Sequence, residues 1–329
     1  MNHLFAEVLR GYFNDYISEL EDLSKSQNTI DSYSSTISTF IYFIENEHQK
    51  DMSFKNIRRS DFTKFLTYKS NNLNKHEDSK PASKALYITH LSQYFEYISS
   101  ESIEKLDFTA IFKKLKIPIP KREPKGVNDE DVEKVLDYLK NKVLEANNYD
   151  SSKSRAKSKN AKQKKQFLAY RNSLLMKMYL YTGIRASELI GVKIKNFNLI
   201  KENLYVFSII GKGNKEAKAY ILASFISEEV NFFKRNDYQL ISITVSGNIL
   251  DRTQTWKVFS TIYKNCNVKA SGIHILRHTF AKDFYKKTKD LRSLQAILRH
   301  VSINTTMIYA AENDEQTQDN YLLAFENNT

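Results

Sequence analysis

Three of the chain's four prolines fall within the ten residues 117–126, and this segment constrains the possible fold more than any other feature. Proline fixes its own backbone torsion and lacks an amide donor, so the segment cannot continue a helix and is expected to be stiff and extended. The chain has 329 residues, whereas single hydrophobic cores stop growing near ~250 residues. We therefore expect two domains, residues 1–116 and 127–329, joined by a linker over residues 117–126.

The first domain is expected to be a bundle of helices. Apolar side chains recur there at spacings of three and four in segments 30–44, 62–66 and 88–98, which is typical of amphipathic helices. The whole chain holds only 8 glycines and 4 prolines, so few residues interrupt helices elsewhere. Helices are therefore the expected main material of the protein.

The second domain is predicted to combine helices with one small β-sheet. One helix is expected after the cap Asn128, and a strongly apolar helix is expected over Phe167–Tyr181, where Gly183 ends it. Two strands, Leu204–Ile210 and Ala219–Leu222, flank a glycine-rich segment that suits a tight hairpin. The predicted fold class is mainly α with a small antiparallel β-sheet in the C-terminal domain, that is, α+β.

The charge balance indicates a polyanionic partner. Lysine and arginine number 50 against 38 aspartate and glutamate, which leaves a formal charge of +12 and a pI near 9.3. Nucleic acid fits this excess better than an acidic membrane does, and charge kept only for solubility is the alternative. Residues 151–165 hold no acid and no large apolar side chain, so we expect a loop that is either a solvated tether or a DNA contact.

Cysteine usage and hydropathy indicate the cytoplasm. Cys266 is the single cysteine, which rules out an intrachain disulfide and a cysteine-based metal cluster. The N-terminus lacks a basic segment followed by an apolar run, and no stretch reaches the ~18 apolar residues of a membrane span. We therefore expect a cytoplasmic protein without a membrane partner.

The densest group of chemically versatile side chains is His274, Arg277 and His278. Their spacings of three and four place them on one face of a helix, where they could converge on one ligand. His274 and His278 could instead bind zinc, but the zinc motif with this spacing needs a glutamate after the first histidine, and Ile275 stands there. Taken alone, His278 is more often a buried, hydrogen-bonded histidine than a catalytic one.

Two further segments complete a recognisable pattern. Residues 182–189 read Thr-Gly-Ile-Arg-Ala-Ser-Glu-Leu, and His300 stands nine residues before Tyr309. The helical bundle and the proline-rich linker look like the core-binding domain and tether of the tyrosine recombinase (phage integrase) family, so the resemblance covers essentially the whole chain. The residues that resemble this family's signature in order and spacing are Arg185, Lys212, His274, Arg277, His278, His300 and Tyr309.

The resemblance implies an enzyme that cuts and rejoins DNA through a covalent bond between Tyr309 and a backbone phosphate. Such exchange passes through a five-coordinate phosphorus with extra negative charge, so fixed cations lower its barrier. Arg185 and Arg277 are the expected pair, because a planar guanidinium offers paired donors to phosphate. A free phenol with a pKa of ~10 is only about 0.1% ionised at pH 7, so Tyr309 needs a proton acceptor or nearby cations.

The family's remaining roles are carried over to five other residues. His274 is the expected proton acceptor, and the near-neutral intrinsic pKa of histidine suits that role. Lys212, at the hairpin tip, resembles the general acid that protonates the departing 5′ oxygen. His300 resembles a phosphate hydrogen-bond donor, whereas Glu188 and His278 are expected to support and orient the site.

Two positions depart from the family's usual pattern. Arg299 stands before His300, where glycine is common, and residues 310–311 are both alanine in place of the frequent Thr-His. Neither change removes a catalytic group. Arg299 is expected either to contact phosphate or to lie on the helix surface.

No cofactor or metal is expected, because exchanging one phosphoester for another conserves the bond energy, and the sequence lacks a Gly-x-x-x-x-Gly-Lys-Ser/Thr loop. The resemblance is greatest to Xer-type recombinases, and it implies a two-domain clamp around double-stranded DNA. It further implies a homotetramer on two dif-like inverted-repeat sites, in which protomers exchange a C-terminal helix over residues 316–325. A DNA translocase or accessory protein is an implied further partner. The implied role is resolution of chromosome dimers on the nucleoid during chromosome segregation and cell division.

Three other functions stay open at this point. The chain could be an integrase or transposase of a phage or mobile element, which is the main alternative. It could also be a DNA-binding relative that no longer cleaves, although all the expected polar groups are present. A type IB topoisomerase shares the chemistry but relaxes supercoils as a monomer, and the small size and the expected exchange helix favour the recombinase.

Overall fold

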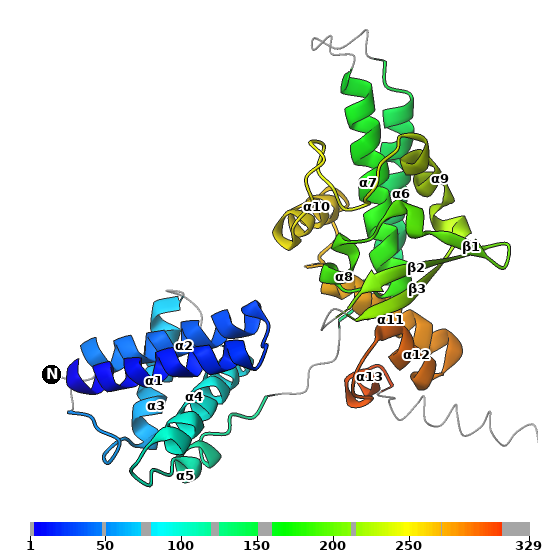
Figure 1. Cartoon of the computed structure of the whole chain (residues 1–329). Helices are drawn as coiled ribbons and strands as arrows, with labels where there is room; N and C mark the ends of the chain where they lie inside the picture. The colour runs from blue at the N-terminus through cyan, green and yellow to red at the C-terminus, as the bar shows by residue number, and fades with distance from the viewer. Residues whose placement is uncertain are drawn as a thin grey trace, which may run out of the picture. The chain divides into compact units, whose positions relative to one another are not determined.

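The computed structural model describes residues 3–47, 51–73, 80–119, 125–150, 160–211, 215–270 and 272–310. The chain divides into two compact units, Met1–Arg122 and Glu123–Thr329 (Figure 1). Each unit has a hydrophobic core of its own. The point of division lies within residues 117–126, where the linker was predicted. The predicted fold class is confirmed, because the described residues are mainly helical with one small antiparallel sheet in the C-terminal unit.

The N-terminal unit is a helical bundle, as its apolar spacing predicted. Ser26 caps the second helix by accepting a hydrogen bond from a first-turn amide, and Pro81 occupies the first turn of the fourth. Aromatic rings fill the core, where Phe40, Phe62 and Phe95 contact one another with ring centroids 5.2 to 5.9 Å apart. The helices among its described residues are α1 (His3–Asp22), α2 (Gln27–Asn46), α3 (Arg59–Leu73), α4 (Pro81–Glu101) and α5 (Thr109–Lys113).

The C-terminal unit packs helices and a sheet around one long helix. The predicted cap Asn128 is confirmed, since its side chain accepts a hydrogen bond from the amide of Asp131 at 2.7 Å. The elements among its described residues are α6 (Asp129–Asn147), α7 (Asn160–Thr182), α8 (Ala186–Ile190), the 3-10 turn η2 (Ile194–Asn196), β1 (Asn198–Ile200), β2 (Leu204–Ile210), β3 (Glu216–Leu222), α9 (Ala223–Arg235), α10 (Arg252–Asn265), α11 (His274–Thr288), α12 (Leu291–Leu298) and α13 (Asn304–Met307).

The sheet has the order β1-β2-β3, and both pairings are antiparallel. Val206 of β2 lies opposite Asn198 of β1 on one side and Tyr220 of β3 on the other. Both predicted strands are present, but β3 begins at Glu216, earlier than predicted. β1 was not predicted, because this three-residue strand is exposed throughout and lacks the alternation that marks a half-buried strand.

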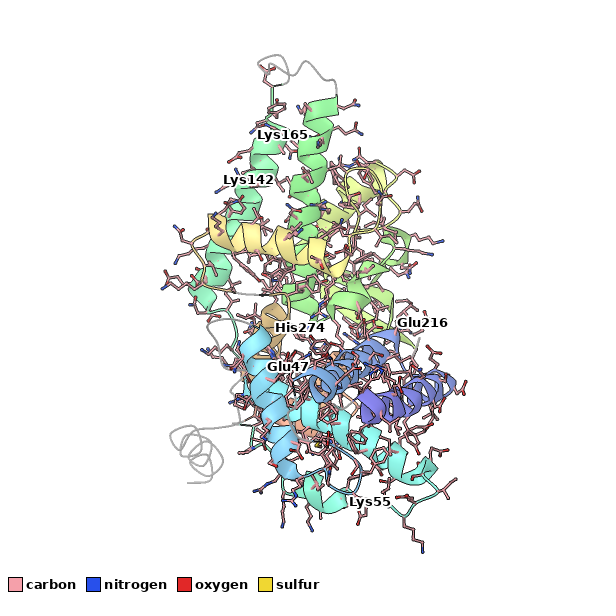
Figure 2. The ribbon with its side chains drawn as sticks, turned by 90° about the vertical axis from the view of Figure 1, so that its left-hand side faces the viewer. Glu47, Lys55, Lys142, Lys165, Glu216 and His274 are labelled. Atoms are coloured by element: carbon pink, nitrogen blue, oxygen red, sulfur yellow. The ribbon has the colours of Figure 1, made fainter. Side chains whose placement is uncertain are left out.

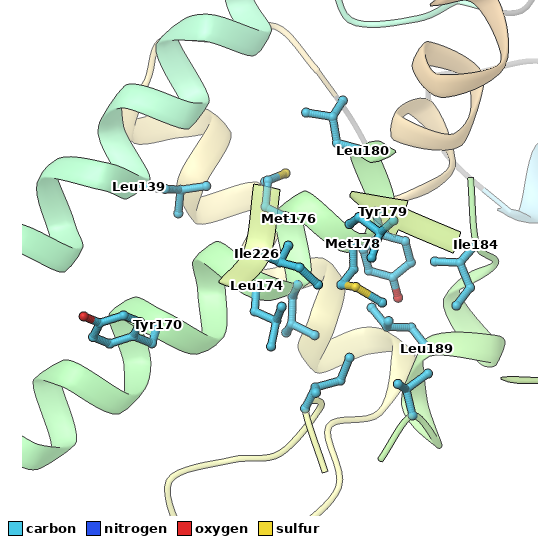
Figure 3. Close-up of a cluster of buried hydrophobic side chains, with 14 of the residues drawn as sticks. Leu139, Tyr170, Leu174, Met176, Met178, Tyr179, Leu180, Ile184, Leu189 and Ile226 are labelled. Atoms are coloured by element: carbon cyan, nitrogen blue, oxygen red, sulfur yellow. The ribbon is translucent and has the colours of Figure 1, made fainter. Parts of the chain in front are cut away.

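α7 is the central helix of the C-terminal unit and is buried on nearly all sides. Leu174, Met176 and Met178 have no exposed area, and they pack with neighbours such as Leu139 of α6 in the cluster that Figure 3 shows. A helix that is apolar at consecutive positions has no solvent face, so other elements must cover it. In the part of the chain that the structure describes, no helix is long and apolar enough to cross a bilayer.

α7 begins at Asn160, seven residues before the predicted start at Phe167. The predicted loop over 151–165 is therefore wrong for residues 160–165, which are helical because lysine, alanine and glutamine are good helix formers. Residues 151–159 lie outside the described residues. Whether that run is a tether or a DNA contact stays a prediction.

Gly183 ends α7, as predicted, and turns the chain sharply. Its φ is +59°, a left-handed conformation that glycine adopts without strain. A Cβ at this position would lie 2.5 Å from Cδ1 of Phe280 and 2.8 Å from Cδ2 of Leu298. Both the backbone and the packing therefore require glycine here.

Replacing Gly183 by alanine is expected to destabilise the C-terminal unit by about 2–4 kcal/mol, through the left-handed backbone and the overlap with the Phe280 ring. Urea unfolding of the full chain measures this difference. Gly191→Ala is the control, because Gly191 has a φ of −91° and an added Cβ would meet no atom within 4 Å. Equal stability of the two variants would contradict this account of the turn.

Candidate active site

The site is built from four short segments of the C-terminal unit that are far apart in sequence. Each segment lies at a helix end, where backbone groups have no intrahelical partner. Seven of the eight predicted site residues belong to the described part of the chain. They are Arg185 and Glu188 at the start of α8, His274, Arg277 and His278 in the first turns of α11, His300 after α12, and Tyr309 after α13.

Arg185 and Glu188 form a local pair at the start of α8. The amide of Arg185 donates to Oε2 of Glu188 at 2.7 Å, and its Nη1 donates to Oε1 at 2.7 Å. A glutamate at the third helical position often reaches back in this way, so the spacing in sequence sets the geometry. The Arg185 side chain is 32% exposed and that of Glu188 only 1%. Arg185 is thus accessible to a ligand, and Glu188 is not.

The buried carboxylate of Glu188 is held in its ionised form by its hydrogen bonds. Burial alone would raise the pKa of Glu188, but hydrogen bonds from the Arg185 amide and the Arg299 guanidinium outweigh burial and lower it. Nη2 of Arg299 donates to Oε2 of Glu188 at 2.8 Å. One carboxylate therefore lies between two guanidinium groups.

Arg277 is the buried centre of the site. It is 6% exposed, and it donates through Nη1 to the carbonyl of Gly183 and through Nη2 to the carbonyl of Leu298, the latter at 2.6 Å. Burial lowers the pKa of Arg277 to about 10, which leaves the side chain cationic at pH 7. Its charge acts on the four other predicted residues around it, His274, His278, His300 and Tyr309.

His300 is a neutral imidazole at pH 7. Burial lowers its pKa to about 4, and the charges of Arg277, Arg185 and Arg299 act in the same direction. Its Nδ1 lies 2.9 Å from Oγ1 of Thr306, a fully buried residue of α13. Thr306 therefore orients the His300 ring.

The phenol of Tyr309 is bonded to His278. Its hydroxyl lies 2.6 Å from Nδ1 of His278, so this histidine has a hydrogen-bond partner inside the site. Burial raises the pKa of Tyr309, while the charge of Arg277 acts in the opposite direction without cancelling the rise. The phenol is therefore protonated at pH 7.

His274, which is labelled in Figure 2, occupies the first turn of α11. Its side chain is accessible to solvent, although its surroundings remove part of its hydration. Loss of hydration lowers the pKa of His274, and the charges of Arg252, Arg277 and Arg185 add to this effect. Arg252, the first residue of α10, was not predicted to belong to the site. Nothing in the spacing of the sequence connects Arg252 with His274, so this cation was missed.

Arg299 lies in the site and not on the helix surface. Its side chain is 14% exposed and is bonded to Glu188. The expectation of a surface position is therefore wrong, because the turn after α12 directs the side chain inwards. The one signal in the sequence was an unusual residue directly before His300.

Lys212 lies outside the described residues, and the structure shows only the base of its hairpin. The amide of Gly211 donates to the carbonyl of Lys215 at 2.8 Å, which closes the turn. A Cβ at Gly211 would lie 4.0 Å from Oε1 of Glu188. The hairpin that carries Lys212 therefore begins beside the site.

The zinc alternative for His274 and His278 gains no support from the neighbouring side chains. Within the described ranges, no three or more histidine, cysteine, aspartate or glutamate side chains are grouped so as to hold a metal ion. Nδ1 of His278 is engaged by Tyr309. The site is instead rich in arginine donors, which favours an anion such as phosphate as its ligand.

Comparison with known proteins points to one family. The sequence pattern of the phage integrase family matches residues 142–316, which is more than half of the chain. Tyrosine recombinase XerD of Listeria monocytogenes is 27% identical over 310 residues, which cover 90% of this chain and 92% of the relative. Tyrosine recombinase XerH of Helicobacter pylori is 28% identical over 267 residues, or 78% of this chain and 68% of the relative.

A solved structure shares the fold. The crystal structure of XerH site-specific recombinase bound to a palindromic difH substrate, a post-cleavage complex, superposes with a TM-score of 0.70 and 23% identity over 93% of this chain and 84% of that chain. The family match includes every segment that builds the site, from Arg185 to Tyr309. The chain therefore belongs to the phage integrase family of tyrosine site-specific recombinases, and it is similar to recombinases of the Xer type.

Proposed function

We propose that this recombinase cuts and rejoins double-stranded DNA at dif-like inverted repeats through a 3′-phosphotyrosyl intermediate on Tyr309, and so resolves chromosome dimers. The observation that carries the proposal is the convergence of Arg185, three histidines and Tyr309 on the buried Arg277. The similarity to XerD over 90% of this chain supports the Xer role. The difH substrate named for the related XerH complex supports the class of DNA site.

Arg185 and Arg277 are the groups proposed to hold the scissile phosphate. The five-coordinate phosphorus gains negative charge on its oxygens, and preorganised cations stabilise that charge. Arg185 is accessible, and its guanidinium is fixed by Glu188. Arg277 is fixed by two carbonyl oxygens, and a guanidinium carries further N–H donors for a phosphate.

Tyr309 is the proposed nucleophile, and its proton must leave before attack. The pKa of Tyr309 is raised by burial, whereas the pKa values of His274 and His278 are lowered by burial. Both imidazoles are therefore neutral at pH 7 and able to accept a proton. We assign proton acceptance to His274, and to His278 the role of holding the phenol in place.

Lys212 is proposed to protonate the 5′ oxygen that leaves as the phosphotyrosine bond forms. A short hairpin whose base lies beside Glu188 would bring a lysine at its tip to that oxygen. The products are a phosphotyrosine ester and a free 5′ hydroxyl, and attack by a DNA hydroxyl restores the backbone and the phenol. Since one phosphoester replaces another, the reaction needs neither ATP nor a metal.

The N-terminal unit is proposed to be the core-binding domain, with residues 1–116 and 127–329 closing around the duplex on the linker 117–126. The exposed Lys113, Lys114 and Lys116, just before the linker, suit contact with backbone phosphates. By the same proposal, four protomers act on two sites at the nucleoid in the cytoplasm, with a translocase or accessory protein as activator. The exchange helix over 316–325 lies outside the described residues.

Tyr309→Phe is expected to abolish covalent attachment to DNA, because only the phenol oxygen can form the ester. The measurement incubates the protein in EDTA with a labelled, nicked duplex that carries the dif-like repeat of its own chromosome, and separates the products on a denaturing gel. The wild type is expected to form the adduct without metal.

Binding is the control in this experiment, since the phenylalanine variant should retain DNA affinity. An adduct that persists in Tyr309→Phe would refute the assignment of the nucleophile. An adduct on a phage or transposon end, but none on the dif-like repeat, would favour the integrase of a mobile element.

The second-order rate of adduct formation is expected to fall in acid, below about pH 6.5. The pH dependence of this rate constant reports the ionisation of groups in the free protein. A protonated imidazole cannot accept the Tyr309 proton. Below the pKa of the acceptor, the rate should therefore fall about tenfold per pH unit. The lowered pKa of His274 places this fall below the ordinary histidine value. His274→Gln should remove the acid limb together with most of the rate. If His278→Gln removes it instead, His278 is the acceptor.

Arg277→Lys is expected to lower the rate of adduct formation by about 100-fold or more, because a lysine cannot donate to both carbonyls and to phosphate. Single-turnover kinetics at saturating DNA measure the loss. Arg171→Lys is the matched control, since Arg171 is 5% exposed in the same unit and donates to the carbonyl of Ile243 at 3.0 Å, away from the site residues. Equal losses in both variants would show that the effect is one of folding.

A further inference from the structure

Arg299 stands where stability alone would favour glycine. It caps the C-terminus of α12 with φ 55° and ψ 45°, a left-handed conformation that is strained for residues with a side chain. Its side chain is only 14% exposed, and its Nε is buried without a hydrogen-bond partner among the described residues. The left-handed backbone and the buried, unpaired Nε each destabilise the fold. The contacts of the guanidinium must therefore explain why an arginine stands at this position.

The contacts of Arg299 form a closed ring with Arg185 and Glu188. Nη2 of Arg299 donates to Oε2 of Glu188 at 2.8 Å, and Nη1 of Arg185 donates to Oε1 at 2.7 Å. Nη2 of Arg185 then donates to the main-chain carbonyl of Arg299 at 3.2 Å. A further bond from Nη1 of Arg299 to the carbonyl of Ile297, at 2.6 Å, fixes the second guanidinium.

We propose that Arg299 is a positioning residue for Arg185. It holds Oε2 of the Glu188 carboxylate while the Arg185 guanidinium holds Oε1, and so sets the direction in which the Arg185 guanidinium meets the scissile phosphate. This inference rests on the proposed function, because that function assigns Arg185 to the phosphate.

The charges around Glu188 support this role. Without Arg299, Arg185 would be the only guanidinium bonded to Glu188, and the carboxylate would offset more of the Arg185 charge. With Arg299 present, the two bonded guanidinium groups and the nearby charge of Arg277 give three positive charges against one carboxylate, a net charge of +2. Such an excess stabilises a phosphate whose negative charge grows in the transition state.

The test is the rate of adduct formation by Arg299→Gly on the nicked duplex with the dif-like repeat. Glycine keeps the carbonyl that accepts from Arg185 and favours the left-handed backbone, so the variant removes the arginine side chain with its guanidinium and leaves the main-chain bond in place. The rate at saturating DNA is expected to fall about 10- to 100-fold, as for a misplaced catalytic group. DNA affinity should change less than about threefold, because many phosphate contacts contribute to it.

Lys289→Gly is the matched control. Lys289 is a basic residue with a left-handed φ of 53° at the C-cap of α11, but its side chain is exposed and contacts none of the site residues described above. Its replacement by glycine relieves the same backbone conformation and also removes one positive charge. The rate of adduct formation should therefore stay at the wild-type value.

Two further variants separate positioning from a loss of folding. Arg299→Lys keeps the charge and should recover part of the rate, and it serves as the test if the glycine variant fails to fold. In a double-mutant cycle with Glu188→Gln, the combined loss should be smaller than the product of the single losses, because Arg299 acts through Glu188.

The outcomes distinguish this inference from the proposed function. If the wild type forms no adduct on the duplex, the proposed function fails and the inference falls with it. If the wild type forms the adduct and Arg299→Gly reacts at the same rate, only the inference is overturned. Single losses that multiply in the double variant would also overturn it, since they would show that Arg299 and Glu188 act independently.

Discussion

The geometry of the site depends on the two hydrogen bonds of one buried guanidinium. Arg277 donates to the carbonyls of Gly183 and Leu298, which lie at the C-terminal ends of α7 and α12. Helix C-termini have unpaired carbonyls and partial negative charge, so a cation is well placed there. Arg185 and His300 each follow one of these carbonyls by two residues. A single side chain thus sets the positions of two others that come from distant parts of the chain.

Electrostatic repulsion is the second property that the site residues share. Burial lowers the pKa values of His274, His278 and His300 below the ordinary value, and the positive charge of Arg277 acts in the same direction. Neutral imidazoles beside charged guanidinium groups make a site that accepts both a phosphate and a proton. Grouping several cations together destabilises the fold locally, as is common at active sites. The apolar packing around α7 offsets this loss of stability.

Local features of the chain were predictable because the interactions that create them span only a few residues. The end of α7 at Gly183 follows from the backbone freedom of glycine, and the pairing of Arg185 with Glu188 follows from a spacing of three residues. His274 and Arg277 share the start of one helix for the same reason. No local pattern shows that these separate segments approach one another. The resemblance to the tyrosine recombinases was needed to connect them.

The amino-acid sequence was sufficient to predict a division into two units, the helical character of both units, the β2–β3 hairpin and the family. The folded chain alone shows that Tyr309 is bonded to His278, 31 residues away, and that Arg299 is bonded to Glu188, 111 residues away. It also shows that the charge of Arg252 acts on His274. Periodicity reveals which face of a helix is buried, because burial follows the helical repeat. The partner of a polar side chain depends instead on how helix ends pack against one another, and that arrangement exists only in the folded chain.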